Sequence, residues 1–455
     1  MTDLSGPKIR NQFDSTQYFE GDTFRSYDLA QNIVDCYPIA TTKESDTIYL
    51  QNGVVWEDYG EQTLRGELWK ILGNAGSTTR INETIEAVKH LSREPRDRLL
   101  GLEPHKVAVK HGVVDMLADP DERYEQVYSG PGTFTRVPVE YNEGAFPDDF
   151  NNFLFEVLPR DDVSIMWELI GYCLFRDYPF QKAFMFLGDG ANGKSTVLAA
   201  LREFLGTDNI ATAELQELAD NRFTPAELDG KLANIAPNIS SEGLEQTGTF
   251  KALTGGDRIR AERKYENAYH FENHAKLIFS ANTPPEAEDD TFAYERRWLY
   301  FDFPHIFSDD KEDAKDPVPQ QELLSQFRDE HAGILNQAFE AFQDLWERGG
   351  FEETIFMQEH DDAHERVLNP VVEFVEDELV LDDDCHVRIC DVDNAYKIWS
   401  KDHGETPQTR ETLKREVHRE YGPATGKDPD NKRFDVWVGL RLKDDHSDSS
   451  AQQTL

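Results

Sequence analysis

One short stretch carries residue types that could bind a polyphosphate. Residues 182–205 read KAFMFLGDGANGKSTVLAALREFL, in which Gly188, Gly193, Lys194 and Ser195 fit the pattern G-x-x-x-x-G-K-[ST]. Glycines permit the backbone conformation in which several N–H groups turn toward one anion. The lysine would reach the β- and γ-phosphates, and the serine hydroxyl would bind Mg²⁺. The stretch predicts a nucleoside triphosphate site; the alternative is an ordinary glycine turn.

The neighbouring residues place this stretch between a strand and a helix. Residues 183–187 form an apolar run typical of a buried strand, and apolar residues then recur at helical spacing until Gly206. A helix beginning near Lys194 adds the positive end of its dipole. We therefore expect ATP and Mg²⁺ as cofactors. The residues expected to hold the nucleotide are Gly188, Asp189, Gly190, Ala191, Asn192, Gly193, Lys194, Ser195 and Thr196.

Polar residues follow two later apolar runs, and these could complete a hydrolytic site. Residues 232–236 predict a short strand, after which Glu242 and Glu245 are the candidates for an acid that holds the metal shell and polarises water. Residues 277–281 predict a buried strand that ends on Asn282, whose amide could orient the attacking water. Both strands are expected to lie beside the phosphate loop.

Two arginines stand directly before a third run. Arg296 and Arg297 precede the predicted strand 298–303. An arginine here could reach a γ-phosphate across a subunit interface and stabilise charge that develops during transfer. The alternative is a surface salt bridge, although the position after Asn282 favours function.

Taken together, five segments resemble a known family. LGDGANGKST, KLANIAPNIS, TGTFKALTGGDRIRAERKY, KLIFSANTPP and YERRWLYFDFP are similar, in order and spacing, to the superfamily 3 helicase core of phage and plasmid primase-helicases, which is related to the poxvirus primase-helicase. The resemblance is strong over 160–310 and weaker over 45–158 and 369–443. It implies an AAA+ P-loop fold, a ring that is usually a hexamer, and ATP-driven translocation on single-stranded or forked DNA.

The resemblance also assigns roles to residues. It makes Lys194 and Ser195 the phosphate-loop pair, Asn282 the sensor, and Arg296 or Arg297 the arginine finger. One position departs from the family: Asn238, in PNIS, stands where relatives commonly carry an aspartate. Asn238 could bind the metal through water, Glu242 could substitute for the missing acid, or the ATPase could be slow.

A basic segment within the core is a candidate DNA contact. Residues 251–264 hold five cations and two acids, Asp257 and Glu262, which gives +3 in a chain of net charge −41. In the family this region leads into the hairpin that faces the central channel, so phosphate contact is the preferred interpretation. The alternative is an intersubunit salt-bridge network. The candidate residues are Lys251, Arg258, Arg260, Arg263 and Lys264.

The C-terminal part resembles a second DNA-binding element. Residues 369–443 have the element pattern of a winged helix, whose third helix would present Leu413, Val417 and Tyr421 inward. On its other faces Arg410, Lys414 and Arg415 could contact DNA phosphates. The alternative is a solvated basic helix that balances nearby acids.

Composition sets the remaining expectations. The chain has 47 basic and 88 acidic residues spread along 455 positions, which resembles the proteins of salt-accumulating halophiles. At molar salt the Debye length is about 3 Å, so net charge hardly affects DNA binding and only close contacts matter. No signal peptide or apolar run of membrane-spanning length is present, which predicts a cytoplasmic protein without membrane contact.

These patterns predict an α/β protein: an AAA+ P-loop core with an N-terminal α/β module and a C-terminal winged helix. The expected segments are a poorly ordered polar lead-in with room for one helix (1–45), the N-terminal module (46–158), the core (159–310), a helical segment (311–368), the winged helix (369–443) and a disordered tail (444–455).

The predicted function is an ATP-dependent replicative DNA helicase, with any primase on a separate chain. One alternative is an ATP-binding replication initiator that acts as a scaffold with weak ATPase activity, which Asn238 favours. Another is an unrelated P-loop enzyme such as a kinase, which would be monomeric and would hydrolyse ATP without stimulation by DNA.

Overall fold

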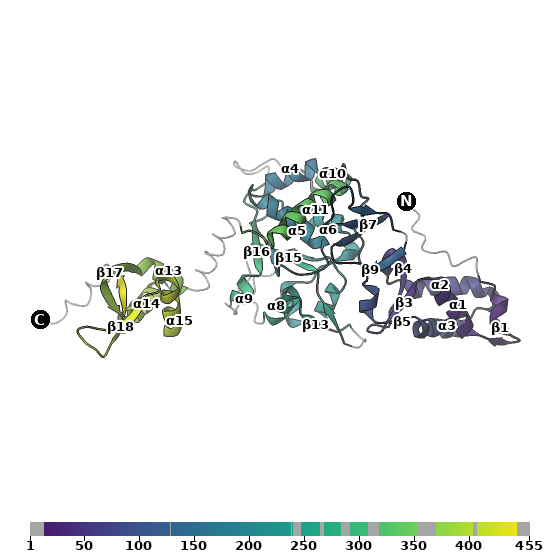
Figure 1. Cartoon of the computed structure of the whole chain (residues 1–455), viewed down its shortest axis with the longest axis horizontal. Coiled ribbons are helices and arrows are strands. Elements are labelled where there is room, and N and C mark those ends of the chain that lie inside the picture. Colours follow the sequence, from purple (N-terminus) through teal and green to yellow (C-terminus); the bar gives the residue numbers. More distant parts are fainter. Residues whose placement is uncertain are drawn as a thin grey trace. The chain divides into compact units, whose positions relative to one another are not determined.

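The computed structural model divides the chain into two compact units, residues 1–354 and 355–455 (Figure 1). The residues that the structure describes are 13–127, 129–237, 239, 247–263, 268–283, 292–307, 318–353, 370–403 and 407–443. Within them, no helix combines the length and the apolar character needed to cross a membrane.

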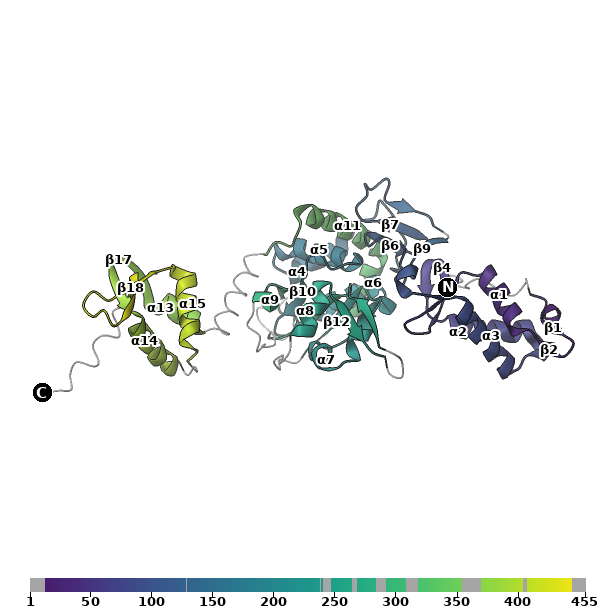
Figure 2. The ribbon, with the colours of Figure 1, turned by 60° about the horizontal axis from the view of Figure 1, so that its bottom comes forward.

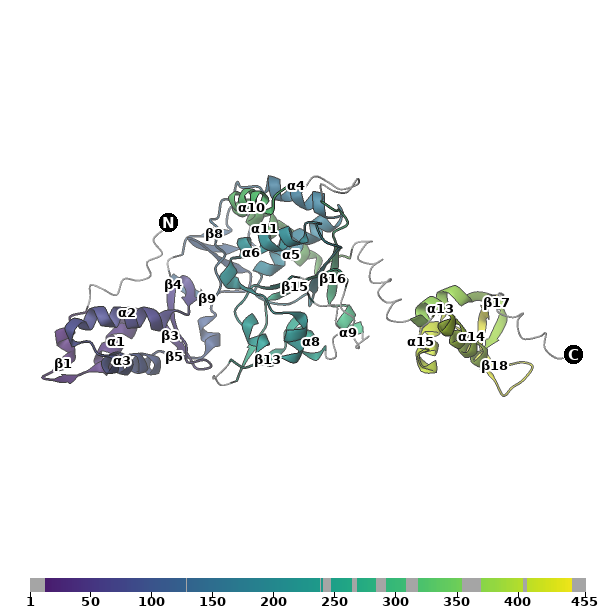
Figure 3. The ribbon, with the colours of Figure 1, turned by 180° about the vertical axis from the view of Figure 1, so that it is seen from behind.

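The N-terminal module begins earlier than the sequence suggested. Residues 13–45 are not a poorly ordered lead-in, because Leu29, Ala30 and Ile33 of helix α1 are buried in one core with α2 and α3 (Figure 3). The sequence pattern gave little indication of this helix because its apolar residues are few and are separated by polar ones. The module's elements are η2 (Ser15–Tyr18), β1 (Phe19–Glu20), β2 (Thr23–Phe24), α1 (Ser26–Cys36), β3 (Ile39–Thr42), β4 (Ile48–Glu57), α2 (Gly60–Leu72), η3 (Gly73–Ala75), α3 (Thr78–Leu91), β5 (Arg93–Glu94), η4 (Arg96–Leu99), β6 (Lys106–Val109), β7 (Gly112–Asp115), β8 (Tyr124–Glu125) and β9 (Ser129–Thr133).

Besides the two-stranded sheet β1-β2, the module has a four-stranded sheet in the order β5-β3-β4-β9 and a three-stranded sheet in the order β6-β7-β8. Residues 135–141 follow these sheets and form an irregular segment. Val137 and Val139 are buried and the segment runs beside β6, where the Val137 N–H donates to the Ala108 carbonyl at 2.9 Å. Pro138 lacks an N–H and cannot continue a ladder of hydrogen bonds.

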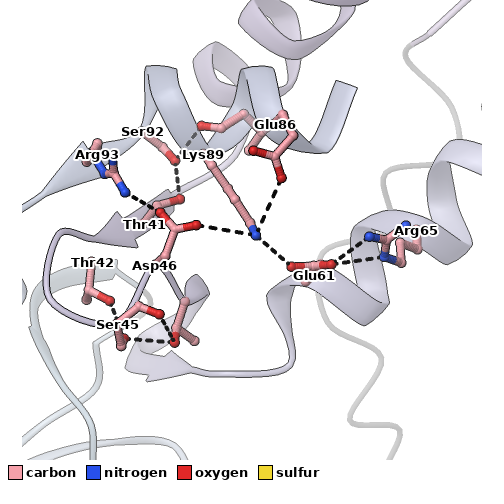
Figure 4. A network of polar contacts seen from close by, with 12 residues as sticks. Thr41, Thr42, Ser45, Asp46, Glu61, Arg65, Glu86, Lys89, Ser92 and Arg93 are labelled. Carbon is pink, nitrogen blue, oxygen red and sulfur yellow. Dashed lines mark hydrogen bonds and ion pairs between the residues drawn. The ribbon is translucent and has the colours of Figure 1, made fainter. Parts of the chain in front are cut away.

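A charged cluster fastens the helices of this module to its strands (Figure 4). The Lys89 ammonium lies 3.2 Å from Glu61, 3.5 Å from Asp46 and 3.7 Å from Glu86. Burial acts to lower the pKa of Lys89, but the ion pairs, that with Glu61 above all, outweigh it and raise the pKa above its ordinary value. One lysine thus pairs with carboxylates from three segments of an acid-rich chain.

The core of the first unit is a five-stranded parallel sheet in the order β11-β12-β15-β10-β16. Its first strand in the chain, β10, lies between two strands that come much later, and all five point the same way. Leu187 pairs with Ala281 on one side and with Asp302 on the other. The strands are β10 (Ala183–Leu187), β11 (Ile210–Ala211), β12 (Ala233–Ala236), β15 (Lys276–Ala281) and β16 (Trp298–Asp302).

Helices cover both faces of this sheet (Figures 1 and 2). One face packs on α7, α8 and the antiparallel β13–β14 hairpin, whose Ile259, Ala261, Tyr269 and Phe271 join its core. Helices α4, α5, α6, α10 and α11 gather on the other side in Figures 1 and 3. The remaining bounds are α4 (Asp148–Val157), α5 (Asp162–Leu174), α6 (Lys194–Leu205), η5 (Thr207–Asn209), α7 (Leu215–Asp220), η6 (Thr224–Leu228), α8 (Gly248–Gly255), β13 (Arg258–Ala261), β14 (Tyr269–Glu272), α9 (Phe292–Glu295), α10 (Gln320–Asp329) and α11 (His331–Arg348).

The helical segment after the sheet belongs to the same unit as the core. Arg328 of α10 makes two hydrogen bonds, of 2.7 and 2.8 Å, to the Glu203 carboxylate on α6, and α11 packs along α5. Gly349 ends α11 in the left-handed conformation, with φ of 84°. Residues 311–317 and 354–368 of the predicted helical segment lie outside the described residues.

Within its described residues, 370–403 and 407–443, the second unit contains three helices and one three-stranded antiparallel sheet in the order β17-β19-β18. Leu413 and Val417 of α15 are fully buried in its core and Tyr421 packs against it, as the sequence predicted. The elements are α13 (Pro370–Glu378), β17 (Leu379–Arg388), α14 (Ile389–Asp402), α15 (Arg410–Tyr421), β18 (Ala424–Lys427) and β19 (Asp435–Leu442).

Candidate nucleotide site

The phosphate loop connects β10 to α6, as predicted, and only glycine fits at two of its positions. Gly188 and Gly193 have φ of 144° and 93°, backbone conformations that residues with a side chain rarely adopt. A Cβ on Gly193 would lie 2.5 Å from Val157 Cγ1, and one on Gly188 would lie 2.9 Å from the Phe303 carbonyl oxygen. A Cβ on Gly190 would meet nothing within 4 Å, so the loop is open on that side.

Lys194 folds back across the loop. Its side chain is buried, and the ammonium donates to the carbonyl of Gly188. Burial lowers the pKa of Lys194, and the carboxylates of Asp189 and Asp302 act in the opposite direction. The lysine therefore lies at the position from which it can meet phosphate oxygens above the loop.

The other loop residues fit a polyphosphate with a bound cation. The hydroxyl-bearing Ser195 is exposed at the start of α6, where the helix dipole is positive. Asn192 is buried, and its amide nitrogen has no hydrogen-bond partner. Thr196 accepts a 3.5 Å hydrogen bond from Gln320 of α10. A cradle of glycines, an exposed hydroxyl and a buried unpartnered donor is suited to triphosphate oxygens and Mg²⁺.

Two polar side chains lie at the same edge of the sheet as the loop. Asn282 follows Ala281, the residue that pairs with Leu187, and it is exposed. Asp302 pairs with Leu187 from the other side. Because the carboxyl ends of parallel strands form one edge, Asn282 comes level with Gly188 and Asp302 with Leu187, directly before it. The sequence predicted Asn282 here but missed Asp302, whose only signal was an acid ending an apolar run.

The two arginines lie at the opposite edge. They precede β16, whose first residue pairs with Ala183 at the start of β10, so a five-residue strand of about 16 Å separates them from the loop. Arg297 is 8% exposed and donates to Thr254 at 3.0 Å and to the Ala293 carbonyl. Arg296 is exposed and donates to Gln181 at 2.9 Å. Neither guanidinium lies at the loop of its own chain.

The basic residues of the core fall on α8 and on the β13–β14 hairpin. Lys251 lies on α8, and Arg258 and Arg260 occupy the exposed positions of β13. Acids accompany these arginines: Arg260 lies 2.8 Å from Glu262, and Arg258 lies 4.0 Å from Glu272. Arg263 lies 3.7 Å from Asp229, an acid that the sequence did not single out. These contacts are within one chain, whereas the alternative considered above was a network between subunits.

In the second unit, Arg410, Lys414 and Arg415 are exposed on α15, away from buried Leu413 and Val417. Arg415 lies 3.1 Å from Glu416. The Asp435 carboxylate is paired with Lys427, and the charges of Lys414 and Arg410 help to lower its pKa.

Three predicted site residues, Asn238, Glu242 and Lys264, lie outside the described residues, as does Glu245. Within the described residues, no group of three or more histidine, cysteine, aspartate or glutamate side chains is placed to hold a metal ion.

Comparison with known proteins gives distant relatives. A family model described as "Family of unknown function (DUF5906)" matches residues 186–297, which include the phosphate loop and both arginines. A protein of Acanthamoeba polyphaga mimivirus, named "Putative helicase L207/L206", is 23% identical over 241 residues, or 50% of this chain. The chain spans about a quarter of that relative's length, 25%.

Solved structures of the NrS-1 C-terminal region show a partial likeness. One apo form of residues 305–718 has a TM-score of 0.49 at 12% identity and covers 91% of this chain and 98% of that one. A second apo structure has a TM-score of 0.48 at 14% identity and covers 92% and 100%.

Proposed function

We propose that the protein is an ATP-dependent DNA helicase whose copies form a ring, usually a hexamer in the resembled family, and hydrolyse ATP at the interfaces between them. One observation carries the proposal: the phosphate loop and Asn282 lie at one edge of the sheet, whereas Arg296 is exposed at the other. A neighbouring copy could supply the arginine that each site lacks. The similarity to the mimivirus protein, over half of this chain, supports the helicase class.

Each residue has a distinct role in this proposal. Backbone N–H groups of residues 188–196 bind the phosphates, Lys194 meets the β- and γ-phosphates, and Ser195 binds Mg²⁺. Bound Mg²⁺ neutralises phosphate charge. Asn282 orients the attacking water, and Arg296 stabilises the transition state in the adjacent copy. Arg297 is assigned instead to holding β16 against α8, because it is buried and hydrogen-bonded there.

The acid of the site is part of the proposal. Glu242, or Asn238 acting through water, would complete the metal shell, since both follow β12 in the sequence. Asp302 adds a carboxylate on the other side of β10, where its charge acts on Lys194. The rates of ATP hydrolysis by the Asn238→Asp and Glu242→Gln variants decide whether Asn238 or Glu242 completes the metal shell. If neither substitution changes the rate, neither residue has this role.

DNA contacts are proposed at two places. In the first unit Lys251, Arg258, Arg260, Arg263 and Lys264 would bind the backbone of single-stranded DNA. In the second, which we propose to be a winged helix, Arg410, Lys414 and Arg415 of α15 would bind phosphates of forked DNA. A separate primase is the proposed partner in replication.

The test is the rate of ATP hydrolysis with and without single-stranded DNA at high KCl, together with strand displacement on a forked duplex. Stimulation of hydrolysis by DNA and unwinding are the expected results. DNA-independent hydrolysis without unwinding would exclude the motor. Stability and full activity in about 0.1 M salt would exclude the halophilic adaptation.

The second candidate is an initiator scaffold that binds ATP for assembly and hydrolyses it slowly. It is favoured by Asn238, an amide at a position where the resembled family commonly has an acid. It predicts ATP-dependent assembly on duplex DNA with no displacement of strands, so the same experiment separates the two functions.

A further inference from the structure

One buried carboxylate touches two parts of the first unit that are far apart in sequence. Asp229 lies between η6 and β12, and its side chain is 6% exposed. One of its oxygens is 3.1 Å from Arg96 of η4 in the N-terminal module. The other is 3.7 Å from Arg263, which follows β13 of the hairpin. A single carboxylate therefore serves two guanidiniums, one from the module and one from the hairpin.

Arg96, Asp229 and Arg263 form a charged triad, in which Arg96 is held firmly by further contacts. Its guanidinium lies 3.9 Å from the centre of the Phe134 ring and donates to the Tyr49 hydroxyl at 3.1 Å. A Cβ on Gly230 would lie 3.0 Å from an Arg96 nitrogen, so glycine at that position keeps room for the guanidinium. Burial acts to lower the pKa of Arg96, but the charge of Asp229 and the Tyr49 contact outweigh it and raise the pKa.

The Arg263 side is looser. Its side chain is 35% exposed, and its guanidinium lies 5.5 Å from the centre of the Tyr269 ring. Tyr269 is the first residue of β14 and pairs with Ala261, the last of β13. Burial and the charge of Asp229 raise the pKa of Tyr269. Asp229 therefore acts on both strands of the hairpin close to its turn.

The charges of the triad are linked. Asp229 carries one negative charge and faces two arginines. The strength of its attraction for Arg263 therefore depends on how much of that negative charge Arg96 already neutralises. With Arg96 in place, Arg263 stays at 3.7 Å and partly exposed, and so can exchange Asp229 for a phosphate. Without Arg96, the carboxylate would have Arg263 as its remaining partner in the triad and would hold it more strongly.

We propose that Asp229 is a positioning residue through which Arg96 of the N-terminal module controls the availability of Arg263 for single-stranded DNA. This inference rests on the proposed function of the hairpin. It makes the N-terminal module part of the DNA-binding apparatus, although the module itself need not touch DNA.

The test measures binding of a fluorescent oligothymidine to the full chain at high KCl. The Arg96→Met change should weaken binding about fivefold, and Arg263→Met by about five- to tenfold, since each removes or masks one phosphate contact. The double variant should bind no more weakly than Arg263→Met alone. Hydrolysis of ATP without DNA should be the same for Arg96→Met as for the unchanged protein.

Arg136→Met is the matched control. Arg136 belongs to the same module, donates to the Asn52 carbonyl at 2.8 Å and lies 3.7 Å from Glu57, both within the module. Its loss should leave the Kd for DNA within twofold. If Arg136→Met and Arg96→Met weaken binding equally, or if the effects of Arg96→Met and Arg263→Met add, the link through Asp229 is excluded.

Tyr49→Phe provides a milder variant in case Arg96→Met does not fold. It loosens Arg96 without removing a charge, so binding should weaken about twofold in the unchanged background and not at all beside Arg263→Met. An equal effect in both backgrounds would overturn the proposal. If the unchanged protein binds no single-stranded DNA, the proposed function itself fails, and this inference with it.

Discussion

The two edges of the central sheet differ in what their polar residues do. At the carboxyl edge, Lys194, Asn282 and Asp302 surround an open glycine loop. At the amino edge, Lys276 and Arg297 are buried and bonded to the protein itself, and Arg296 is the exposed cation of the two arginines. The first edge carries polar groups beside an open loop, whereas at the second the buried cations hydrogen-bond to neighbouring backbone and side chains.

This difference bears on how the site would be completed. Charge stabilisation in phosphoryl transfer needs a cation at the γ-phosphate, and a guanidinium about 16 Å away along β16 cannot supply it in the same chain. In the proposed function Arg296 must therefore act on another copy, which predicts an assembly of at least two subunits.

The largest expected effect comes from Lys194→Ala at the carboxyl edge. It should reduce kcat/KM for ATP hydrolysis by roughly 10³-fold, because it removes a cation at the developing charge. Lys182→Met is the matched control at the other end of β10, where Lys182 lies 3.2 Å from Glu353. Equal losses of kcat/KM in the two variants would contradict the proposal that ATP binds at the carboxyl edge of the sheet.

An effect of similar size is expected for Arg296→Ala, which should lower kcat by about 10³-fold. Mixing equal amounts of Arg296→Ala and Lys194→Ala subunits should restore part of the hydrolysis, since about a quarter of all interfaces in randomly mixed rings would join an intact loop to an intact arginine. Steady-state ATPase rates of the mixture measure this. Arg297→Ala should mainly lower thermal stability. Absence of any recovery on mixing would show that the arginine does not act between copies.

At the amino edge we expect Lys276→Met to affect stability. The Lys276 ammonium donates to the carbonyls of Phe175, Asp177 and His274 at 2.7 to 2.8 Å and lies over the Tyr172 ring. Its loss should cost on the order of 3 kcal/mol in the free energy of unfolding, because buried carbonyls lose their donor. Denaturant unfolding measures this, and a change in KM for ATP at unchanged stability would be the contrary result.

The smallest effect concerns pH. Burial lowers the pKa of His331 to about 4 from an ordinary 6.5, and its ring packs against Phe204 of α6. Between pH 6.5 and pH 4 His331 binds a proton in the unfolded chain but not in the folded chain. The free energy of unfolding is therefore highest above pH 6.5 and decreases as the pH falls toward 4. The loss should be on the order of 2 kcal/mol.

Thermal unfolding between pH 7 and 4 should show this loss, and His331→Phe should reduce it. The same acid sensitivity in both proteins would assign it to other groups.

Much of the core followed from local patterns. The strand 183–187 and the helix after the loop were predicted because an apolar run, a glycine-rich turn and a 3.6-residue period are all local signals. The same holds for Leu413 and Val417 of α15. Residues 13–45 were misjudged because their few apolar residues form a core only with α2 and α3, which lie further along the chain.

The sequence by itself determined the phosphate loop, the order of the strands along the chain and the residues that end them. The tertiary structure decided which edge of the sheet each residue occupies, that Arg297 is buried while Arg296 is exposed, and that Asp302 and Asp229 lie beside Lys194 and Arg263. The physical reason is that strand neighbours and ion pairs join residues roughly 30 to 130 positions apart, and such contacts leave no periodic signal in the sequence.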